Sequence, residues 1–132
     1  MIYKKKLIEL REEKELKQYE IANILGIYKG LYNQYETEYE IIPIKHLNTL
    51  CNYFHVSFDY MFEFTKEKNY KEINPEIDLI KAGQRLKELR KEIKKTQTGL
   101  ANELNCSYGT IAGYEIGRYL IATPFLYTLC KK

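Results

Sequence analysis

The sequence repeats itself at a fixed distance of 79 residues, and this feature constrains the fold more than any other. Residues 3–53 align with residues 82–132 without a gap, and 17 of the 51 aligned pairs are identical. Chance gives roughly three or four identities over such a length, so the similarity reflects a duplication. Each copy is expected to form one structural unit of about 60 residues, with the same helices in the same order.

Composition narrows the kind of unit that each copy forms. A unit of this size buries only about 60% of its unfolded surface, so it must be compact or supported by a neighbour. Leu, Ile and Tyr dominate the apolar residues, whereas the chain has only 7 Gly and 3 Pro. These proportions favour helical units over a disordered chain or a β-sandwich. The formal net charge of +3 is weak evidence for a polyanionic partner.

Apolar residues at helical spacing predict the first two helices of each repeat. The stripe of the first helix consists of Leu7, Leu10 and Lys14 in repeat 1, and of Leu86, Leu89 and Ile93 in repeat 2. The second helix carries Ile21, Ala22 and Leu25 in repeat 1, and Leu100, Ala101 and Leu104 in repeat 2. Thr96 is a good N-cap for this helix, whereas Lys17 is a poor one.

A sharp turn follows the second helix in both repeats. Gly26 and Asn105 stand at its end, and these residue types accept most readily the left-handed conformation that terminates a helix. A third short helix begins a few residues later, with Ser107 as its cap in repeat 2. Its inward residues are Tyr32 and Tyr35 in repeat 1, and Ile111 and Tyr114 in repeat 2. Two helices joined in this way predict a helix-turn-helix unit.

A fourth helix is predicted in both repeats, after Pro43 in repeat 1 and near Pro124 in repeat 2, and a fifth helix in repeat 1 only. The fourth follows Pro43, with Leu47, Leu50, Cys51 and Phe54 as its core, and the fifth is capped by Ser57 and carries Phe58, Met61 and Phe62. We expect domain 1 at 1–64, a linker at 65–77 and domain 2 at 78–132, with a helix start at Asn74-Pro75-Glu76. Repeat 2 has no counterpart of 54–62. Either the chain is a piece of a longer one, or repeat 1, the linker or another chain covers the uncovered face.

The motifs of both repeats resemble the Cro/repressor-type helix-turn-helix family, the XRE-like transcriptional regulators. They are Lys17-Gln18 to Ala22, Leu25-Gly26-Ile27, Tyr35-Glu36, Pro43 and Ser57–Tyr60 in repeat 1, and Thr96–Ala101, Asn105–Ser107 and Thr110–Arg118 in repeat 2. The resemblance implies an all-α fold of two tandem lambda-repressor-like five-helix bundles, the second lacking its last helix. It also implies that the third helix enters the major groove of DNA.

Candidate DNA-binding residues follow from the resemblance by position. Gln18 and Gln97 would bond a phosphate at the start of the second helix. The base-reading positions are Tyr28, Lys29, Gly30, Asn33 and Gln34 in repeat 1, and Ser107, Tyr108, Gly109, Ala112 and Gly113 in repeat 2, with Thr110 nearby. Lys donates to guanine and Asn or Gln pairs with adenine, so repeat 1 has the stronger readers.

In the segment after the third helix, it is repeat 2 that has the residues better suited to contact DNA. Repeat 2 keeps Gly117-Arg118, which would approach the phosphate backbone, whereas repeat 1 has Glu38 and Glu40, which would repel it. We therefore expect high affinity to need both units on one duplex. The resemblance also implies two structural salt bridges, Arg11 with Glu36 and Arg90 with Glu115. These four residues are expected to hold the fold and not to touch DNA.

Other classes of function find little support in the sequence. His46 and His55 have no partners at catalytic or metal-binding spacing, so no metal site, cofactor or enzymatic activity is expected. No apolar run is long enough to span a membrane, and the three cysteines suit a reducing cytoplasm. The main prediction is a cytoplasmic DNA-binding transcriptional regulator, most simply a repressor, whose partner is double-stranded DNA. The alternatives are a protein-interaction module or an antitoxin-like protein, with a homodimer or protein partner covering repeat 2.

Overall fold

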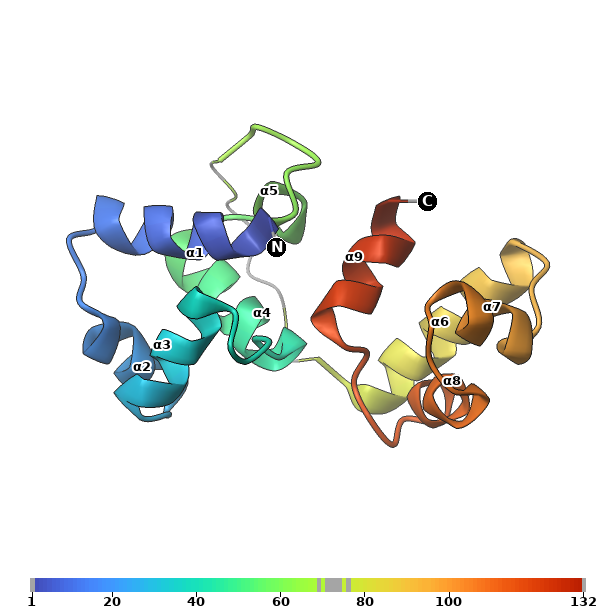
Figure 1. Cartoon of the computed structure of the whole chain (residues 1–132). Helices are drawn as coiled ribbons and strands as arrows, with labels where there is room; N and C mark the ends of the chain where they lie inside the picture. The colour runs from blue at the N-terminus through green and yellow to red at the C-terminus, as the bar shows by residue number, and fades with distance from the viewer. Residues whose placement is uncertain (1, 69, 71–74, 76, 132) are drawn as a thin grey trace. The chain divides into compact units, whose positions relative to one another are not determined.

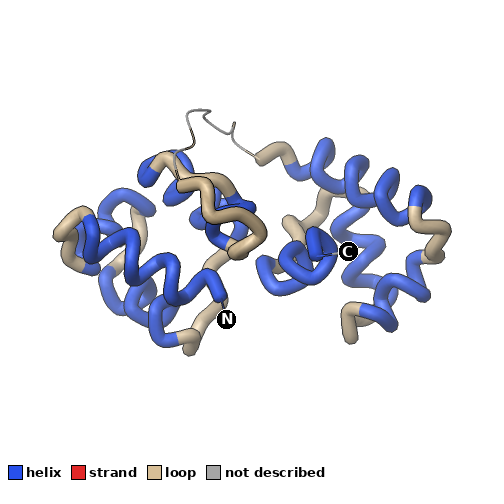
Figure 2. The backbone as a smooth tube through the Cα atoms, turned by 90° about the horizontal axis from the view of Figure 1, so that it is seen from above, coloured by secondary structure: helices blue, strands red, loops and turns tan. Residues whose placement is uncertain are grey.

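The computed structural model describes residues 2–68, 70, 75 and 77–131 of the 132-residue chain. Within these ranges all regular structure is helical, with nine helices and no strand (Figures 1 and 2). The predicted all-α class is therefore confirmed for this part of the chain. The chain divides into two compact units, Met1–Pro75 and Glu76–Lys132, which are described one at a time.

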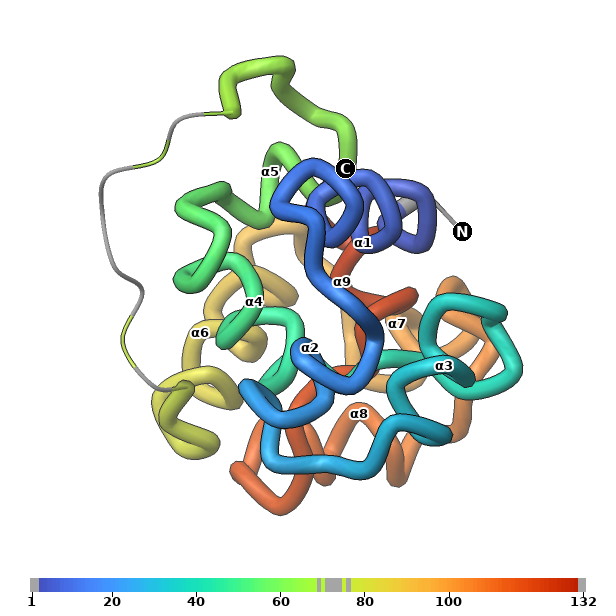
Figure 3. Tube along the Cα trace, turned by 90° about the vertical axis from the view of Figure 1, so that its left-hand side faces the viewer, coloured from blue at the N-terminus to red at the C-terminus, as the bar shows by residue number. Residues whose placement is uncertain are grey.

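The first unit consists of five helices around one core. They are α1 (Ile2–Glu13), α2 (Gln18–Leu25), α3 (Lys29–Thr37), α4 (Ile44–Phe54) and α5 (Phe58–Met61). The first helix contacts α3 and α5, while α2 packs on α3 and α4. Figure 3 shows this unit with α1 seen nearly end-on and with α2 and α3 joined by their short turn.

Most residues predicted to face inward in the first unit are buried, but Leu25 and Phe58 are half-buried and Lys14 is exposed. Tyr32 and Tyr35 of α3 are buried, and the four predicted core residues of α4 are buried as well. Met61 and Phe62, at the end of α5, are each 1% exposed. The ring of Phe62 meets that of Tyr3 edge-on, with 6.2 Å between centroids, so the fifth helix closes the core against the start of α1.

Local side-chain chemistry sets the helix ends. Gly26 ends α2 in the left-handed conformation with φ +70°. The Ser57 Oγ accepts a hydrogen bond from the backbone N–H of Tyr60 and starts α5, as predicted. Lys17 gives α2 no side-chain cap. Instead, the Glu20 carboxylate accepts a 3.0 Å hydrogen bond from the Lys17 backbone N–H, which stabilises the first turn.

The second unit has four helices in the described residues: α6 (Leu79–Glu92), α7 (Gln97–Glu103), α8 (Tyr108–Glu115) and α9 (Thr123–Lys131). Its core consists of Leu86, Leu100, Ala101, Leu104, Ile111 and Tyr114, against which Cys106, Ile121, Phe125 and Leu129 pack. The predicted caps are present, because the Thr96 hydroxyl accepts from the Gly99 N–H and the Ser107 hydroxyl from the Thr110 N–H.

The start of α6 differs from the predicted start at 74–76. Asn74 and Glu76 lie outside the described residues, and the helix begins at Leu79. The Asp78 carboxylate caps it by accepting from the backbone N–H groups of Ile80 and Lys81. A carboxylate that satisfies two of the unpaired N–H groups of a first turn fixes the start more strongly than the Asn-Pro-Glu pattern.

One glycine explains how closely α6 approaches α8. A Cβ atom on Gly83 would lie 2.4 Å from the Tyr114 carbonyl oxygen and 2.6 Å from that of Glu115. No side chain fits in this space, so only glycine allows the two helices to pack at this distance. The aligned position of the first repeat is Lys4, and the two repeats therefore pack their first and third helices differently.

The apolar stripe of α6 is largely uncovered. Leu86 is buried, but Leu89 is 39% and Ile93 47% exposed. The stripe predicted from the sequence is thus only partly a core stripe. No helix in the described part of the chain is both long enough and apolar enough to span a membrane.

Candidate nucleic-acid interface

A buried ion pair ties the third helix of the first unit to the first. Arg11 donates from Nε to Glu36 Oε2 at 2.7 Å and from Nη2 to Oε1 at 3.0 Å. Its Nη1 atom donates to the Leu16 carbonyl at 3.0 Å. A two-pronged contact of this kind fixes both distance and orientation. The pair therefore positions α3 on the unit and leaves the opposite side of α3 outward.

The same hydrogen bonds recur in the second unit, each shifted by 79 residues. Arg90 donates from Nε to Glu115 Oε2 at 2.7 Å and from Nη2 to Oε1 at 3.1 Å. It also donates from Nη1 to the Lys95 carbonyl at 2.9 Å. Gln97 donates to Glu115 Oε1 at 3.1 Å, as Gln18 does to Glu36. Duplicated side chains thus make duplicated contacts in both units.

The two glutamates remain charged despite their burial. Burial by itself would raise the pKa of Glu36, but hydrogen bonds, first from Arg11, outweigh it and lower the pKa below its ordinary value. For Glu115 the same balance applies, with Arg90 and Gln97 as the donors that lower the pKa. At neutral pH both carboxylates are therefore ionised and bound to arginine.

The side chain of Gln18, predicted to contact a phosphate, makes hydrogen bonds within the protein instead. Its amide nitrogen donates to Asn33 Oδ1 at 3.0 Å and to Glu36 Oε1 at 3.1 Å. An amide nitrogen has two hydrogens, so both are used within the protein. In this arrangement a phosphate would meet the N-terminal backbone of α2, and the Gln18 side chain would instead orient Asn33.

The outward face of α3 presents the predicted reader residues of the first unit. Tyr28, Lys29, Gly30 and Asn33 are exposed, and Gln34 is half-buried. The Tyr28 ring lies close over Gly30, where an added Cβ would be 3.0 Å from a ring carbon. The Asn33 oxygen accepts from Gln18, and the amide nitrogen of this exposed residue is a donor of the kind that suits the acceptor atoms of a base edge.

The end of α3 is acidic. Glu38 ends the helix in the left-handed conformation with φ +64°, and Glu40 follows it, both exposed. The corresponding positions of the second unit are Gly117, with φ +81°, and Tyr119, with the exposed Arg118 between them. The charge beside the third helix therefore has opposite sign in the two units.

The third helix of the second unit offers few outward hydrogen-bonding groups. The hydroxyl of its N-cap Ser107 and that of Thr110 bond to one another, with Ser107 Oγ and Thr110 Oγ1 2.8 Å apart. The Ser107 Oγ also accepts from the Thr110 backbone N–H. Tyr108 and Gly109 are exposed and Ala112 is half-buried. Tyr108 is the largest outward group on this helix.

A tyrosine ring covers one predicted reader position. An added Cβ on Gly113 would lie 2.8 Å from two ring carbons of Tyr119, and Gly113 is buried. Sequence reasoning missed this contact, because the two residues lie in a helix and in the loop after it. The signal was present: glycine stands where the first repeat has Gln34, and tyrosine stands where it has Glu40.

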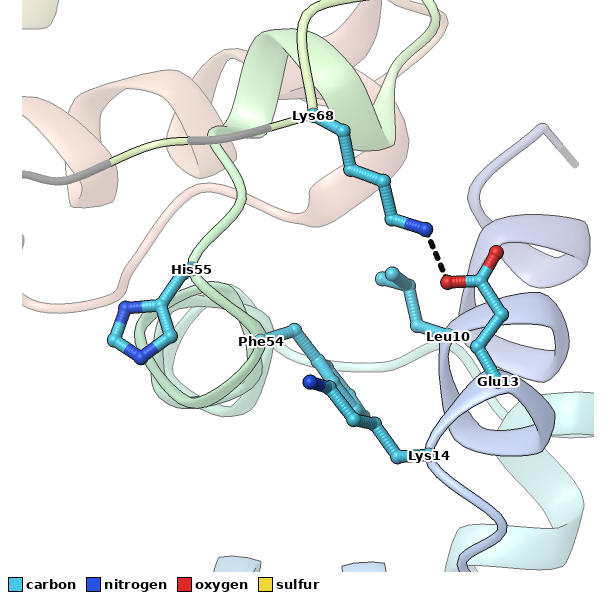
Figure 4. Close-up of a pocket in the computed structure, with 6 residues that line it drawn as sticks. All are labelled: Leu10, Glu13, Lys14, Phe54, His55 and Lys68. Atoms are coloured by element: carbon cyan, nitrogen blue, oxygen red, sulfur yellow. Dashed lines mark hydrogen bonds and ion pairs between the residues drawn. The ribbon is translucent and has the colours of Figure 1, made fainter.

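The described residues contain no cluster of three His, Cys, Asp or Glu side chains able to hold a metal ion. A cavity of about 280 Å³ in the first unit is lined by Leu10, Glu13, Lys14, Phe54, His55 and Lys68. Figure 4 shows Lys68 bonded to Glu13 across it, while the His55 ring points away. The lining brings no catalytic set together.

Residues 7–61 match a family model described as helix-turn-helix. The matched range runs from α1 to the end of α5, so it covers the geometry described above for the first unit. The match supports a Cro/repressor-type helix-turn-helix and with it a DNA-binding transcription regulator, a class that is generally non-enzymatic. No curated protein and no solved structure gave a significant match to the chain.

Proposed function

We propose that the chain is a sequence-specific regulator, a repressor in the simplest case, that binds double-stranded DNA with two helix-turn-helix units. The proposed domains are 1–64 and 78–132, joined by a linker at 65–77. The observation that carries the proposal is the outward face of α3, where Lys29 and Asn33 are exposed on a helix anchored by the Arg11–Glu36 pair. A rigid helix with outward donors is what reading the major groove requires.

The second unit supports a second contact with DNA. Its buried pair repeats that of the first unit atom for atom, which anchors α8 as α3 is anchored. Arg118 is exposed just after α8. We infer that the first unit selects the sequence and the second adds a phosphate contact. The linker would hold the second unit near the duplex at high effective concentration.

The test is a titration of the full chain on DNA, followed by selection of preferred sites from random duplex. Lys29→Ala is expected to weaken binding to the selected site by about 5-fold to 150-fold, as the loss of one base contact does. Lys5→Ala removes an exposed lysine of α1 and is the charge-matched control. Equal effects of the two substitutions would contradict the assignment of α3 as the reading helix.

A second measurement separates the roles of the two units. Arg118→Ala is expected to lower the slope of log affinity against log salt by about 0.9 without changing the preferred sequence. Asn33→Ala is expected to relax the preference at one base position instead. A change of preferred sequence with Arg118→Ala would show that the second unit also reads bases.

The alternative is a protein-interaction or antitoxin-like module, and the second unit favours it specifically. The hydroxyls of Ser107 and Thr110 bond to each other, and Tyr119 covers Gly113, so its third helix offers little to a base edge. In the first unit, Glu38 and Glu40 would face the phosphates. Absence of binding to random duplex at low salt would favour this alternative.

A further inference from the structure

The second unit has an open apolar groove on the side of α6. Leu86, Leu89, Arg90, Ile93, Leu100 and Leu129 line it, and its volume is about 180 Å³. Leu89 and Ile93 form its exposed rim. Apolar surface left open beside a small core costs free energy in water, so such a groove marks a place where another segment packs.

The duplication indicates what kind of segment fits. In the first repeat Leu10 corresponds to Leu89, and it is 3% exposed where Leu89 is 39% exposed. Phe54 lines the same cavity as Leu10 in the first unit, and α5, which packs against α1, follows it, with Met61 and Phe62 buried. The leucine is thus buried in the unit that has an aromatic residue at the end of its fourth helix and a short apolar helix after it.

An ion pair of the first unit indicates which charge a segment that covers this groove would carry at its end. In the first unit Lys68, which follows α5, forms an ion pair with Glu13 of α1 (Figure 4). The corresponding residue of the second unit is Glu92, which is 62% exposed in its side chain and lies 3.8 Å from Arg85. A segment that docks as α5 does would therefore meet Glu92 with a basic residue.

The size of the groove also favours an aromatic anchor. An apolar cavity of about 150 Å³ holds a benzene molecule, so about 180 Å³ accepts one aromatic ring. A two-fold contact with a second copy would require this same face to supply the ring. The groove is lined by leucine, isoleucine and arginine and offers none. The lining thus favours a different polypeptide as the occupant.

We propose that this groove of the second unit is a docking site for a short apolar helix of another protein. The helix carries an aromatic anchor and further large apolar residues, followed by a lysine or arginine that meets Glu92. The binding surface is defined by Leu86, Leu89, Ile93, Leu129 and Glu92. These residues belong to α6 and α9, and none of them belongs to the face of α8 that the proposed DNA contact uses.

The chain itself supplies a probe of this chemistry. A fluorescent peptide with the sequence of residues 53–68 contains the aromatic anchor, the short helix and the lysine. Titration of the full chain into this peptide is expected to give saturable binding with a Kd below about 1 mM. The control peptide has Phe54, Phe58 and Phe62 replaced by serine and is expected not to bind.

Variants of the full chain locate the site. Leu89→Glu is expected to weaken peptide binding at least about tenfold, and Ile93→Glu is the second variant, chosen because both positions are exposed and tolerate substitution. Ile41→Glu replaces an exposed residue of the first unit and is expected to leave binding unchanged. Thermal unfolding of each variant shows that it is folded.

Two outcomes overturn the proposal. The first is absence of saturable binding, or binding that Leu89→Glu and Ile93→Glu both leave unchanged. The second is concentration-dependent dimerisation of the chain, measured by sedimentation, that Leu89→Glu abolishes, because the occupant is then a second copy.

Discussion

Replacement of Arg90 by alanine is expected to remove most of the stability of the second unit. The Arg90 side chain is 10% exposed and that of Glu115 is 2% exposed. Without Arg90, the Glu115 carboxylate keeps one hydrogen bond, from Gln97, and the Lys95 carbonyl loses its side-chain donor. Removal of one partner from a buried ion pair costs about 3–5 kcal/mol, because the other charge stays buried without compensation.

This cost is large beside the total stability of so small a unit. The second unit runs from Glu76 to Lys132, 57 residues. At 0.05–0.15 kcal/mol per residue, its free energy of unfolding is about 3–9 kcal/mol. Each kcal/mol lowers the Tm of a small domain by about 4–8 °C, so the expected loss is at least about 12 °C. At the upper end of the cost, a unit whose free energy of unfolding is below about 5 kcal/mol is unfolded at room temperature.

The assay is thermal unfolding of the full chain at pH 7, followed by circular dichroism. Arg85→Ala is the matched control, because Arg85 lies on the same helix and pairs with Glu88 while both side chains are more than 60% exposed. Such a surface pair contributes about 1 kcal/mol or less. If Arg90→Ala lowered the Tm no more than Arg85→Ala does, the buried pair would not be what holds α6 to α8.

Three further outcomes are expected. Gly83→Ala should destabilise the second unit by about 1–3 kcal/mol in chemical denaturation, because the Cβ of the alanine would overlap the α8 backbone. Gly109→Ala on α8 is the control and should be neutral or stabilising, because a Cβ there meets no close atom. The pKa of Glu115 is lowered in the folded unit below the ordinary carboxyl value of 4.5, so the ionised carboxylate stabilises the folded unit at neutral pH. This stabilisation should be lost as the pH falls through the lowered pKa, because the carboxylate is then protonated. A Tm that stays constant from pH 7 to pH 3 would contradict this. Thiol labelling at pH 8, followed by mass spectrometry, should modify exposed Cys130 first and leave Cys51 until the first unit unfolds, because burial raises the pKa of Cys51 to about 12.

Most local features of the fold could be predicted, because they depend on a few neighbouring residues. Gly26 ends α2 and Ser107 starts α8 through contacts within three or four residues, and the sequence contains all of that information. The duplication also made a contact between distant residues predictable, because it aligns Arg11 with Arg90 and Glu36 with Glu115. The start of α6 was placed too early, since Asp78 caps it in preference to the Asn-Pro-Glu segment.

The candidate site could be predicted in position but not in detail. Outward exposure of Lys29 and Asn33 follows from helical spacing. The engagement of both Gln18 donors depends on how α2 packs against α3, and the placement of Tyr119 over Gly113 depends on how the loop after α8 folds back onto that helix. Such contacts join residues that no helical period relates, so a residue-type pattern does not reveal them. The exposure of Leu89 likewise depends on what covers α6.

The close approach of α6 to α8 has a consequence for how a duplicated chain reaches its native state. Two repeats with matching arginines and glutamates risk exchanging partners during folding, with a helix of one copy docking into the other. Lys4 stands in α1 where Gly83 stands in α6. Because even a Cβ at Gly83 would lie 2.4 Å from a backbone oxygen of α8, Lys4 in that position would force α1 away from α8. The difference between glycine and lysine at this one position thus disfavours the exchange, while the ion pair itself stays identical in both copies.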